Sequence, residues 1–339
     1  MQSRRSNILG QKPINLKRGQ ASMSDLLDGQ SYAGGTIYLN AKSGATVATA
    51  MENGNDGNDG LSWDSPVLTM SKALSLVKTG GRVLFVGDVR EELTGSNLLF
   101  DITIEGAGSL HHPDSPTSAY HPGASMWRPP ASPTATTPLL NLRGRGWNFK
   151  NIAFDCPVDD AAVVLSRNAS SGADEYDASH ASFIGCRFLS GAYGIEDAGG
   201  GNNITVVDCE FAGMTTAAIY GSSTSVANPR VWKIYNNIFP SHVGGALGNV
   251  CHIDLSLNES IVEWNKFGTV VSTGLYVNLT GGNDNIVTNN FMMGVYDTGD
   301  YISGTGDSWV GNQTISTGIT DTAVVDARLV SLAVPTAGT

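Results

Sequence analysis

A repeated pattern in the C-terminal half, a scarcity of charged residues and an abundance of glycine predict an all-β fold: a right-handed, single-stranded parallel β-helix, or solenoid. Charged residues make up 15% of the 339 residues, and 41 residues are glycine. Ordinary globular chains contain about 25% charged residues. Few helix-favouring Lys, Glu and Arg, and many Asn, Ser, Thr, Gly and Val, indicate many short strands joined by turns.

Six segments share the repeat, in which a bend residue, usually Asn, comes three positions after an apolar residue and two positions before Phe. The segments are 183–188, 206–211, 234–239, 262–267, 286–291 and, in degenerate form, 309–314. Their bend residues lie at 186, 209, 237, 265, 289 and 312, which gives spacings of 23, 28, 28, 24 and 23 residues. A period in this range is the signature of a solenoid.

If each period is one coil, equivalent residues lie about 4.8 Å apart, as in neighbouring strands of a sheet. Asn tolerates the left-handed bend and its amide can bond to the next Asn, so these slots predict a ladder. Cys186 and Cys209 occupy two of the slots; a disulfide between them is geometrically possible, and buried reduced thiols are the preferred interpretation. The repeat also predicts one interior stack of rings, formed by Phe188, Phe211, Phe239, Phe267 and Phe291.

The N-terminal half contains the start of the same architecture. Apolar residues at helical spacing, followed by Gly80 and Gly81, predict a capping helix at about 66–78. Strand-like runs follow at 83–86 and 102–104.

A family resemblance rests on the order of these features. An Asp/Asn/Gly-rich loop at 54–62, a Pro-led helix, a Gly-Gly entry to the first strand and a later Gly-rich turn at 104–109 come in this order. The chain thereby resembles the pectin-lyase-like β-helix superfamily over roughly residues 35–320. The resemblance implies the fold and says little about function.

We expect three parts: an N-terminal arm at 1–31, the β-helix at 32–320 and a C-terminal tail or cap at 321–339. Within the β-helix, the Pro-rich segment at about 111–138 predicts a loop that protrudes from a coil. A linker between two domains is the alternative interpretation of that segment.

Charge divides the arm from the body. Residues 1–24 carry a net charge of +5 and the remaining residues carry −16, which together give the total of −11. An acidic body is a poor binder of nucleic acid, whose phosphates it repels. The arm suits an acidic protein surface or nucleic acid, and a solvated tail is the alternative. Its basic residues are Arg4, Arg5, Lys12, Lys17 and Arg18.

No cofactor, metal or membrane span is predicted. No stretch approaches the roughly 18 apolar residues of a membrane span, and no apolar signal-peptide core follows the basic residues at the N-terminus. The four cysteines match neither a disulfide framework nor a zinc site. Turn chemistry alone explains Asp56 and Asp59, whose loop lacks the Glu that closes a helix-loop-helix calcium site.

Candidate catalytic acids are scattered and form no recognised set. They are Asp174, Glu175 and Asp177 in one loop, Glu196 and Asp197 after the first clear repeat, and Asp254, Glu259 and Glu263 near His252. The paired-Asp and Gly-His-Gly patterns of polygalacturonases and the Asp-His strand motif of pectate lyases are missing from the sequence. Solvation of an acidic surface is the alternative role for all of these acids.

Trp264 is the best candidate for a binding surface. The position before the bend is otherwise small or polar, so we expect it to point outward. An exposed Trp beside Glu263 and Lys266 suits stacking on a sugar ring or packing on a neighbouring subunit. In the alternative, Trp264 folds over its own coil.

The resemblance implies two classes of function, because the superfamily includes polysaccharide-degrading enzymes as well as bacteriophage tailspikes and tail fibres. Since no export signal is present, we expect a virion protein that is assembled in the host cytoplasm. Its arm would attach it to tail or head proteins, and its β-helix, as a homotrimer, would recognise a host surface polysaccharide. A polysaccharide lyase or glycoside hydrolase is the alternative.

Overall fold

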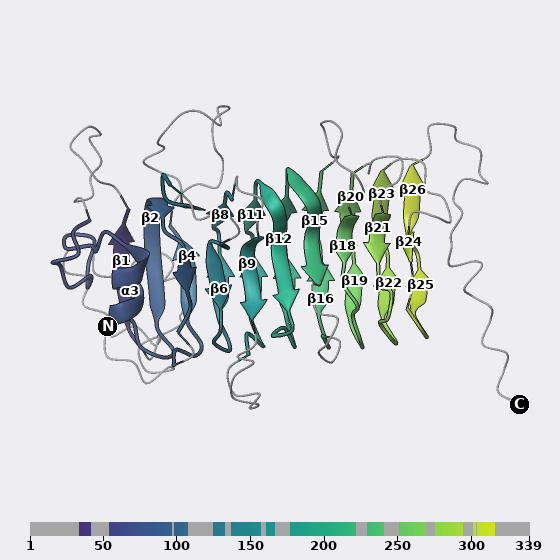
Figure 1. Cartoon of the computed structure of the whole chain (residues 1–339), viewed down its shortest axis with the longest axis horizontal. Helices are drawn as coiled ribbons and strands as arrows, with labels where there is room; N and C mark the ends of the chain where they lie inside the picture. The colour runs from purple at the N-terminus through teal and green to yellow at the C-terminus, as the bar shows by residue number, and fades with distance from the viewer. Residues whose placement is uncertain are drawn as a thin grey trace, which may run out of the picture.

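The chain forms a right-handed parallel β-helix, seen in the computed structural model from the side in Figure 1. The structure describes residues 34–41, 54–96, 98–107, 125–132, 137–156, 161–166, 177–221, 229–240, 251–268, 275–293, 301–302 and 304–315. The expected arm at 1–31 and tail at 321–339 lie outside these residues.

Each coil contributes up to three short strands, one to each of three parallel sheets that we name A, B and C. Sheet A contains β1 (Thr36–Asn40), the first part of β2 (Arg82–Arg90), β4 (Thr103–Gly106), β7 (Asn148–Lys150), β10 (Ser182–Ile184), β13 (Thr205–Val207), β16 (Lys233–Tyr235), β19 (Ile261–Glu263), β22 (Ile286–Thr288) and β25 (Ser308–Val310). Sheet B contains the second part of β2, then β5 (Ser125–Arg128), β8 (Ala153–Phe154), β11 (Arg187–Phe188), β14 (Glu210–Phe211), β17 (Ile238–Phe239), β20 (Lys266–Phe267), β23 (Phe291–Met293) and β26 (Gln313–Ile315). Sheet C contains β3 (Leu93–Thr94), β6 (Leu140–Leu142), β9 (Ala161–Ser166), β12 (Gly191–Ala198), β15 (Met214–Gly221), β18 (Cys251–Asp254), β21 (Leu275–Asn278) and β24 (Tyr301–Ile302).

Single residues in the left-handed conformation make the corner between sheets A and B. Their φ angles lie between 52° and 75°, in a region that Gly, Asn and Asp enter most easily. This requirement explains why those residue types are abundant in the chain. The corner residues are Asn151, Gly185, Asp208, Asn236, Trp264, Asn289 and Gly311.

The predicted asparagine ladder is present in the interior, one residue after each corner. Asn237 Nδ2 donates to Asn265 Oδ1 at 3.0 Å, and Asn265 Nδ2 donates to Asn290 Oδ1 at 3.0 Å. Asn290 continues the ladder to Asn312 at 2.9 Å. The prediction of Asn289 in this slot is wrong: Asn289 makes the corner, and the fully buried Asn290 takes the ladder position.

The cysteines in the ladder slots match the preferred interpretation. Cys186 and Cys209 are both buried and free, on adjacent coils. Their thiols donate to main-chain carbonyls, as small side chains in these slots must.

Four of the five rings predicted for the interior aromatic stack are present in it. Neighbouring ring centroids lie 4.6 Å, 5.1 Å and 4.7 Å apart from Phe188 through Phe267. Phe291 does not continue the stack: it pairs with Lys266 on the outer face and is 37% exposed, whereas Met292 is buried beside Phe267. A shift of one residue moves a side chain to the other face of a strand, and the extra Asn produces that shift here.

The capping helix is shorter than the predicted 66–78. Helix α3 spans Met70–Leu76, with Thr69 as its N-cap. Val67 forms a parallel bridge with Leu39, so the segment before Thr69 is extended and the helix begins later. No helix in the described part of the chain has the length and apolarity needed to cross a membrane.

Part of the predicted protruding loop at 111–138 is instead a strand. Residues Ser125–Arg128 form β5 in sheet B, and Trp127 is fully buried there. The Trp127 indole donates to the carbonyl of Glu91 at 2.9 Å, which satisfies its one polar atom. The prolines that follow at 129 and 130 end the strand, because proline lacks the N–H that a central strand needs.

The Asp/Asn/Gly loop holds the start of the helix. Asp56 Oδ1 accepts the main-chain N–H groups of Leu68 and Thr69, both at 2.9 Å. Asp59 accepts from Leu61 N and the Ser65 hydroxyl. These bonds give both carboxylates a structural role in the turn, and within the described residues no group of three or more His, Cys, Asp or Glu is arranged to hold a metal.

Candidate functional site

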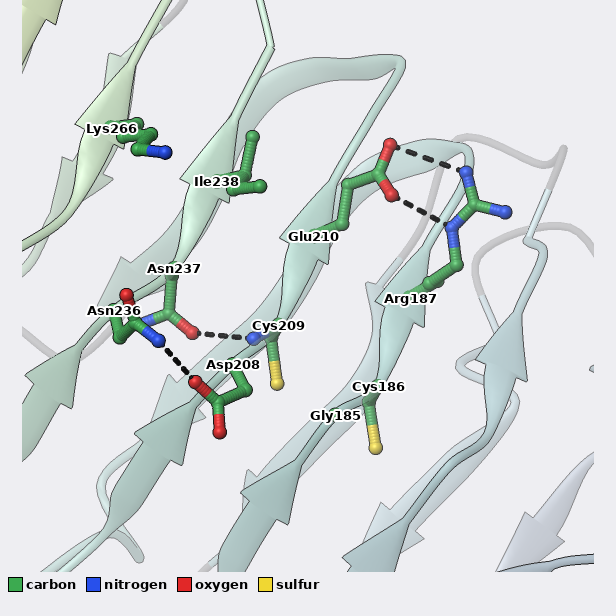
Figure 2. A pocket seen from close by; sticks show the side chains of 10 residues that line it. All are labelled: Gly185, Cys186, Arg187, Asp208, Cys209, Glu210, Asn236, Asn237, Ile238 and Lys266. Carbon is green, nitrogen blue, oxygen red and sulfur yellow. Dashed lines mark hydrogen bonds and ion pairs between the residues drawn. The ribbon is translucent and has the colours of Figure 1, made fainter. Parts of the chain in front are cut away.

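A shallow groove of about 430 Å³ lies along the corner between sheets A and B (Figure 2). It crosses β11, β14, β17 and β20, which are neighbours on four successive coils, so it runs parallel to the solenoid axis. Its lining residues are Gly185, Cys186, Arg187, Asp208, Cys209, Glu210, Asn236, Asn237, Ile238 and Lys266.

Alternation along each coil places these side chains. The left-handed corner residue faces outward, the ladder residue faces inward, and the first residue of the sheet B strand faces outward again. In Figure 2 the side chains of Cys186, Cys209 and Asn237 point down from their strands, whereas that of Glu210 points the opposite way, toward Arg187. The repeat therefore builds both the interior ladder and the lining of the groove.

Charged side chains in the groove are partly paired. Arg187 and Glu210 form a two-pronged ion pair, with Nε–Oε2 at 2.8 Å and a second bond at 3.2 Å. Asn236 Nδ2 donates to Asp208 Oδ1. The exposed Lys266 makes no ion pair with any residue in the described ranges. The groove thus presents planar hydrogen-bonding groups and one available ammonium.

The thiol of Cys209, on the floor of the groove, is held in its protonated form. Burial raises the pKa of the Cys209 thiol well above its usual value, and its contact with Cys186 acts in the same direction. A thiol that stays protonated is a poor nucleophile. Burial of Cys209 therefore disfavours its thiolate.

Trp264 is not among the residues that line the groove, but it lies on the same coil as Lys266, which does line it, and it is 55% exposed. It occupies the corner column directly after Asn236, with φ of 56°. All other residues in this column are Gly, Asn or Asp, and a bulky side chain there costs about 1–2 kcal/mol. Glu263 ends the sheet A strand and Lys266 opens the sheet B strand of the same coil. The corner therefore brings all three predicted binding residues together.

A second cluster lies on the outer face of sheet C. Glu196, Tyr220, Asp254 and Asn278 are register partners on four successive coils. Ile195 and Asp197 beside Glu196, Ile219 before Tyr220, and Ile253 and Leu255 beside Asp254 are all buried. Glu196, Tyr220 and Asp254 therefore face out. The rings of Tyr193 and Tyr220 stack at 4.3 Å with an angle of 8°.

Electrostatics in this cluster follow from partial burial. Burial raises the pKa of Asp254, opposed by the bond that its Oδ1 accepts from Asn278 Nδ2 at 2.8 Å. Burial also raises the pKa of Tyr193 to about 12, helped by Tyr220 and by the charges of Glu196 and Asp254. Two strand spacings put the backbones of Glu196 and Asp254 roughly 9.6 Å apart.

The remaining acids have structural roles or lie apart. Asp177 is buried and accepts from Arg145 Nε at 2.9 Å. Asp197 points into the core, where burial raises its pKa to about 7 against bonds from three consecutive glycine N–H groups. Asp174, Glu175 and the basic residues of the arm lie outside the described residues.

Asp254, Glu259 and Glu263, which lie near His252 in the sequence, do not gather around it in the structure. His252 is buried against the edges of the stacked rings of Phe239 and Phe267, and its Nε2 lies 3.1 Å from the carbonyl oxygen of Gly268. Glu259 makes a different corner and pairs with Arg230 at 3.5 Å. Asp254 and Glu263 lie on different sheets, so a shared site is excluded.

Sequence analysis missed the two tyrosines and the groove residues that flank the bend. The repeat contains the signal for the groove, because Asp208, Glu210 and Asn236 come immediately before or after a bend slot. Tyr193 and Tyr220 belong to strands outside the repeated segment, where no recurring pattern aligns them.

No protein-family model matches the sequence, and no curated protein matches it. In fold, the chain is similar to the GH136 lacto-N-biosidase from Eubacterium ramulus, with a TM-score of 0.51 and 14% identity over 83% of this chain and 56% of that chain. An alginate lyase from Paenibacillus sp. str. FPU-7 gives a TM-score of 0.43 and 14% identity over 71% of this chain and 93% of that chain. ORF18 of Geobacillus virus E2 gives a TM-score of 0.31 and 13% identity over 83% and 61%. Identities this low bear on the fold alone.

Proposed function

We propose that the protein is a tail fibre or tailspike of a bacteriophage that binds a host surface polysaccharide in the corner groove, with Trp264 as its stacking platform. One observation carries the binding site: a bulky indole is held in a left-handed corner, 55% exposed, where the other described corners between sheets A and B have Gly, Asn or Asp. Local strain of this kind is retained where it serves a function.

The groove has the chemistry that a sugar chain needs. An exposed indole stacks on the C–H face of a sugar ring. The amide of Asn236 and the guanidinium of Arg187 offer donors to hydroxyl groups, and Lys266 offers a further cation. These groups lie on successive coils along the solenoid axis, so the groove suits an extended polymer. The solenoid shared with a lacto-N-biosidase supports a carbohydrate ligand.

The virion assignment rests on the charge of the two parts. Residues 1–24 of the arm carry +5 and the rest of the chain −16, so the start of the arm suits an acidic partner surface. We propose that residues 1–31, with Arg4, Arg5, Lys12, Lys17 and Arg18, attach the protein to tail or head proteins. The body would then be a homotrimer that projects from the virion and presents the groove.

Binding of the full chain to immobilised bacterial surface polysaccharides tests the site. Replacement of Trp264 by Ala should weaken binding at least tenfold, whereas Ile286→Ala, which removes a 45% exposed apolar side chain from β22 outside the groove, should not. Equal binding by the wild type and Trp264→Ala would show that the groove is not the site.

Polysaccharide hydrolysis on sheet C is the second candidate. Glu196 and Asp254 flank Tyr220 with a backbone separation of roughly 9.6 Å. The carboxyl groups of inverting glycosidases lie about 6.5–9.5 Å apart, and their general acid has a raised pKa, as Asp254 has. Release of reducing ends from the bound polysaccharide, lost in both Glu196→Gln and Asp254→Asn, would favour this function. If the protein binds the polysaccharide without shortening it, the result favours a binding function over hydrolysis.

A further inference from the structure

We propose that Cys186 and Cys209 form an oxidation site, at which a peroxide converts their thiols into an intrachain disulfide that joins and stabilises two adjacent coils of the solenoid. Both residues are buried and not disulfide-bonded in the structure. The reaction takes place in the interior and involves no polysaccharide. The inference therefore goes beyond the binding function proposed above and does not depend on it.

The two cysteines are register partners on adjacent coils. Strand β10 pairs with β13 just before them, and Arg187 pairs with Glu210 just after them, at the same spacing of 23 residues that separates the cysteines. Neighbouring strands of a sheet lie about 4.8 Å apart, and a disulfide joins Cα atoms that lie about 4.4–6.8 Å apart. The backbone spacing therefore suits the bond without a rearrangement of the coils.

The side chains are also oriented for the bond. Figure 2 shows the sulfur atoms of Cys186 and Cys209 pointing down from neighbouring strands. A hydrogen bond between the two side chains brings the thiols into contact. Cys186 Sγ donates to the carbonyl of Phe149 at 3.5 Å, and Cys209 Sγ donates to that of Phe183 at 3.4 Å. A disulfide is excluded where the two Cα–Cβ bonds point apart, whereas these two point the same way.

The disulfide would extend the side-chain ladder. The amide of Asn237 bonds to Asn265 on the following coil, and its Oδ1 accepts the main-chain N–H of Cys209 on the preceding coil at 2.9 Å. Beyond Asn237, the two cysteines occupy the ladder slots, and their thiols donate to main-chain carbonyls. A bond between the two sulfur atoms would link these coils covalently through their side chains.

One molecule of hydrogen peroxide balances the reaction. One thiol loses its proton, its sulfur attacks a peroxide oxygen, and the O–O bond breaks to give a sulfenic acid and one water. The second thiol loses its proton and attacks the sulfenic sulfur, so that the S–S bond forms, the S–O bond breaks and a second water leaves. The cysteine pair gives up two electrons, and the peroxide takes them up. An oxidant close to water in size suits a fully buried pair.

Protonation of the thiols should make this reaction slow. Burial disfavours the thiolate of Cys209, and only a thiolate attacks the oxidant. The rate should therefore rise with pH.

The other two cysteines serve as internal controls. Cys251 opens β18 in sheet C, where its register partners are Ala217 and Leu275. Cys156 follows the end of β8, and its thiol donates to the carbonyl of Ala161 at 3.7 Å. Neither adjoins another cysteine in the described sheets, so both should remain thiols.

Treatment of the reduced full chain with hydrogen peroxide at pH 8, followed by alkylation in denaturant and digestion with trypsin, tests the inference. Trypsin cleaves after Arg187, between the two cysteines, so the disulfide joins peptide 168–187 to peptide 188–230. We expect mass spectrometry to detect this linked pair, and dithiothreitol to separate it. The melting temperature of the oxidised chain should rise by about 5 °C or more, because the bond closes a loop of the unfolded chain.

Serine variants isolate the pair. Cys186→Ser keeps a donor for the carbonyl of Phe149 and should lose both the linked peptides and the rise in melting temperature. Cys251→Ser, which replaces a buried cysteine of sheet C, should keep both. Alkylation of all four cysteines after treatment, a link to Cys156 or Cys251, or a sulfinic acid in place of the link would each overturn the inference. A linked chain whose melting temperature does not rise would overturn it as well.

Discussion

Asn265 donates from Nδ2 to Oδ1 of Asn290 at 3.0 Å in the interior of the solenoid, and the main-chain N–H of Asn265 donates to the same oxygen at 2.9 Å. One amide oxygen thus receives two bonds from the coil before it. The same pattern joins Asn237 to Asn265 and Asn290 to Asn312. The ladder therefore ties four successive coils together through side chains as well as strands.

Loss of one ladder member should destabilise the fold. Replacement of Asn265 by Leu leaves the two donors of Asn237 without their acceptor in a buried site, at a cost of about 1–3 kcal/mol. Chemical denaturation with wild type and variant measures the difference in the free energy of unfolding.

The register at the next coil has its own test. Asn290→Leu should be as costly as Asn265→Leu, whereas Asn289→Gly should cost little, because Gly accepts the left-handed corner. If Asn289→Gly proved the more harmful of the two, the ladder register would be wrong at this coil.

Trp264 should lower the free energy of unfolding, because a bulky residue strains the left-handed corner, while its exposed ring contributes to binding. Asn tolerates the left-handed corner that Trp264 occupies, so Trp264→Asn should raise the free energy of unfolding by about 1 kcal/mol while polysaccharide binding falls. Thermal denaturation and the binding assay on the same preparation give both quantities. A variant that is less stable than the wild type would contradict the strain argument.

Asp197 should make stability depend on pH between about 4 and 7. Burial raises the pKa of Asp197 to about 7 in the folded chain, above the usual 3.8. The folded state then holds a proton that the unfolded state has lost, so stability is highest below pH 4 for this group and decreases as the pH rises to 7. Urea denaturation at several pH values should show a smaller decrease in Asp197→Asn, which mimics the protonated acid. An identical decrease in both proteins would exclude this role of Asp197.

Deletion of residues 1–31 should separate attachment from folding. Because the segment precedes β1, the first described strand, the truncated chain should keep the melting temperature of the full chain. Without the basic residues it should no longer copurify with virions. Reversal of the five basic residues to Glu in the full-length chain provides the matched control and should have the same effect on copurification. Assembly of the truncated protein onto virions would refute the anchor.

Association of three chains is expected from the exposed sheet faces of the solenoid. Light scattering should give three times the monomer mass of 35.5 kDa. A particle of monomer mass at micromolar concentration would rule out the trimer.

The sequence by itself determined the solenoid, because the repeat of bend, ladder and Phe positions reports the stacking of coils directly. It also placed Cys186 and Cys209 in buried slots and Trp264 in an outward one. These inferences depend only on the period and on the alternation of side chains along a strand.

Only the tertiary structure decided the register at Asn289 and Asn290 and the composition of the sheet C face. Asn289 and Asn290 each suit either the bend or the ladder by local preference. The register is decided by packing, because Met292, and not Phe291, is buried beside Phe267. Tyr220 follows Glu196 by 24 residues and Asp254 follows Tyr220 by 34. Connections of unequal length between the strands hide this alignment from any periodic pattern. The side chains meet because main-chain hydrogen bonds hold the strands in register, whatever the length of chain between them.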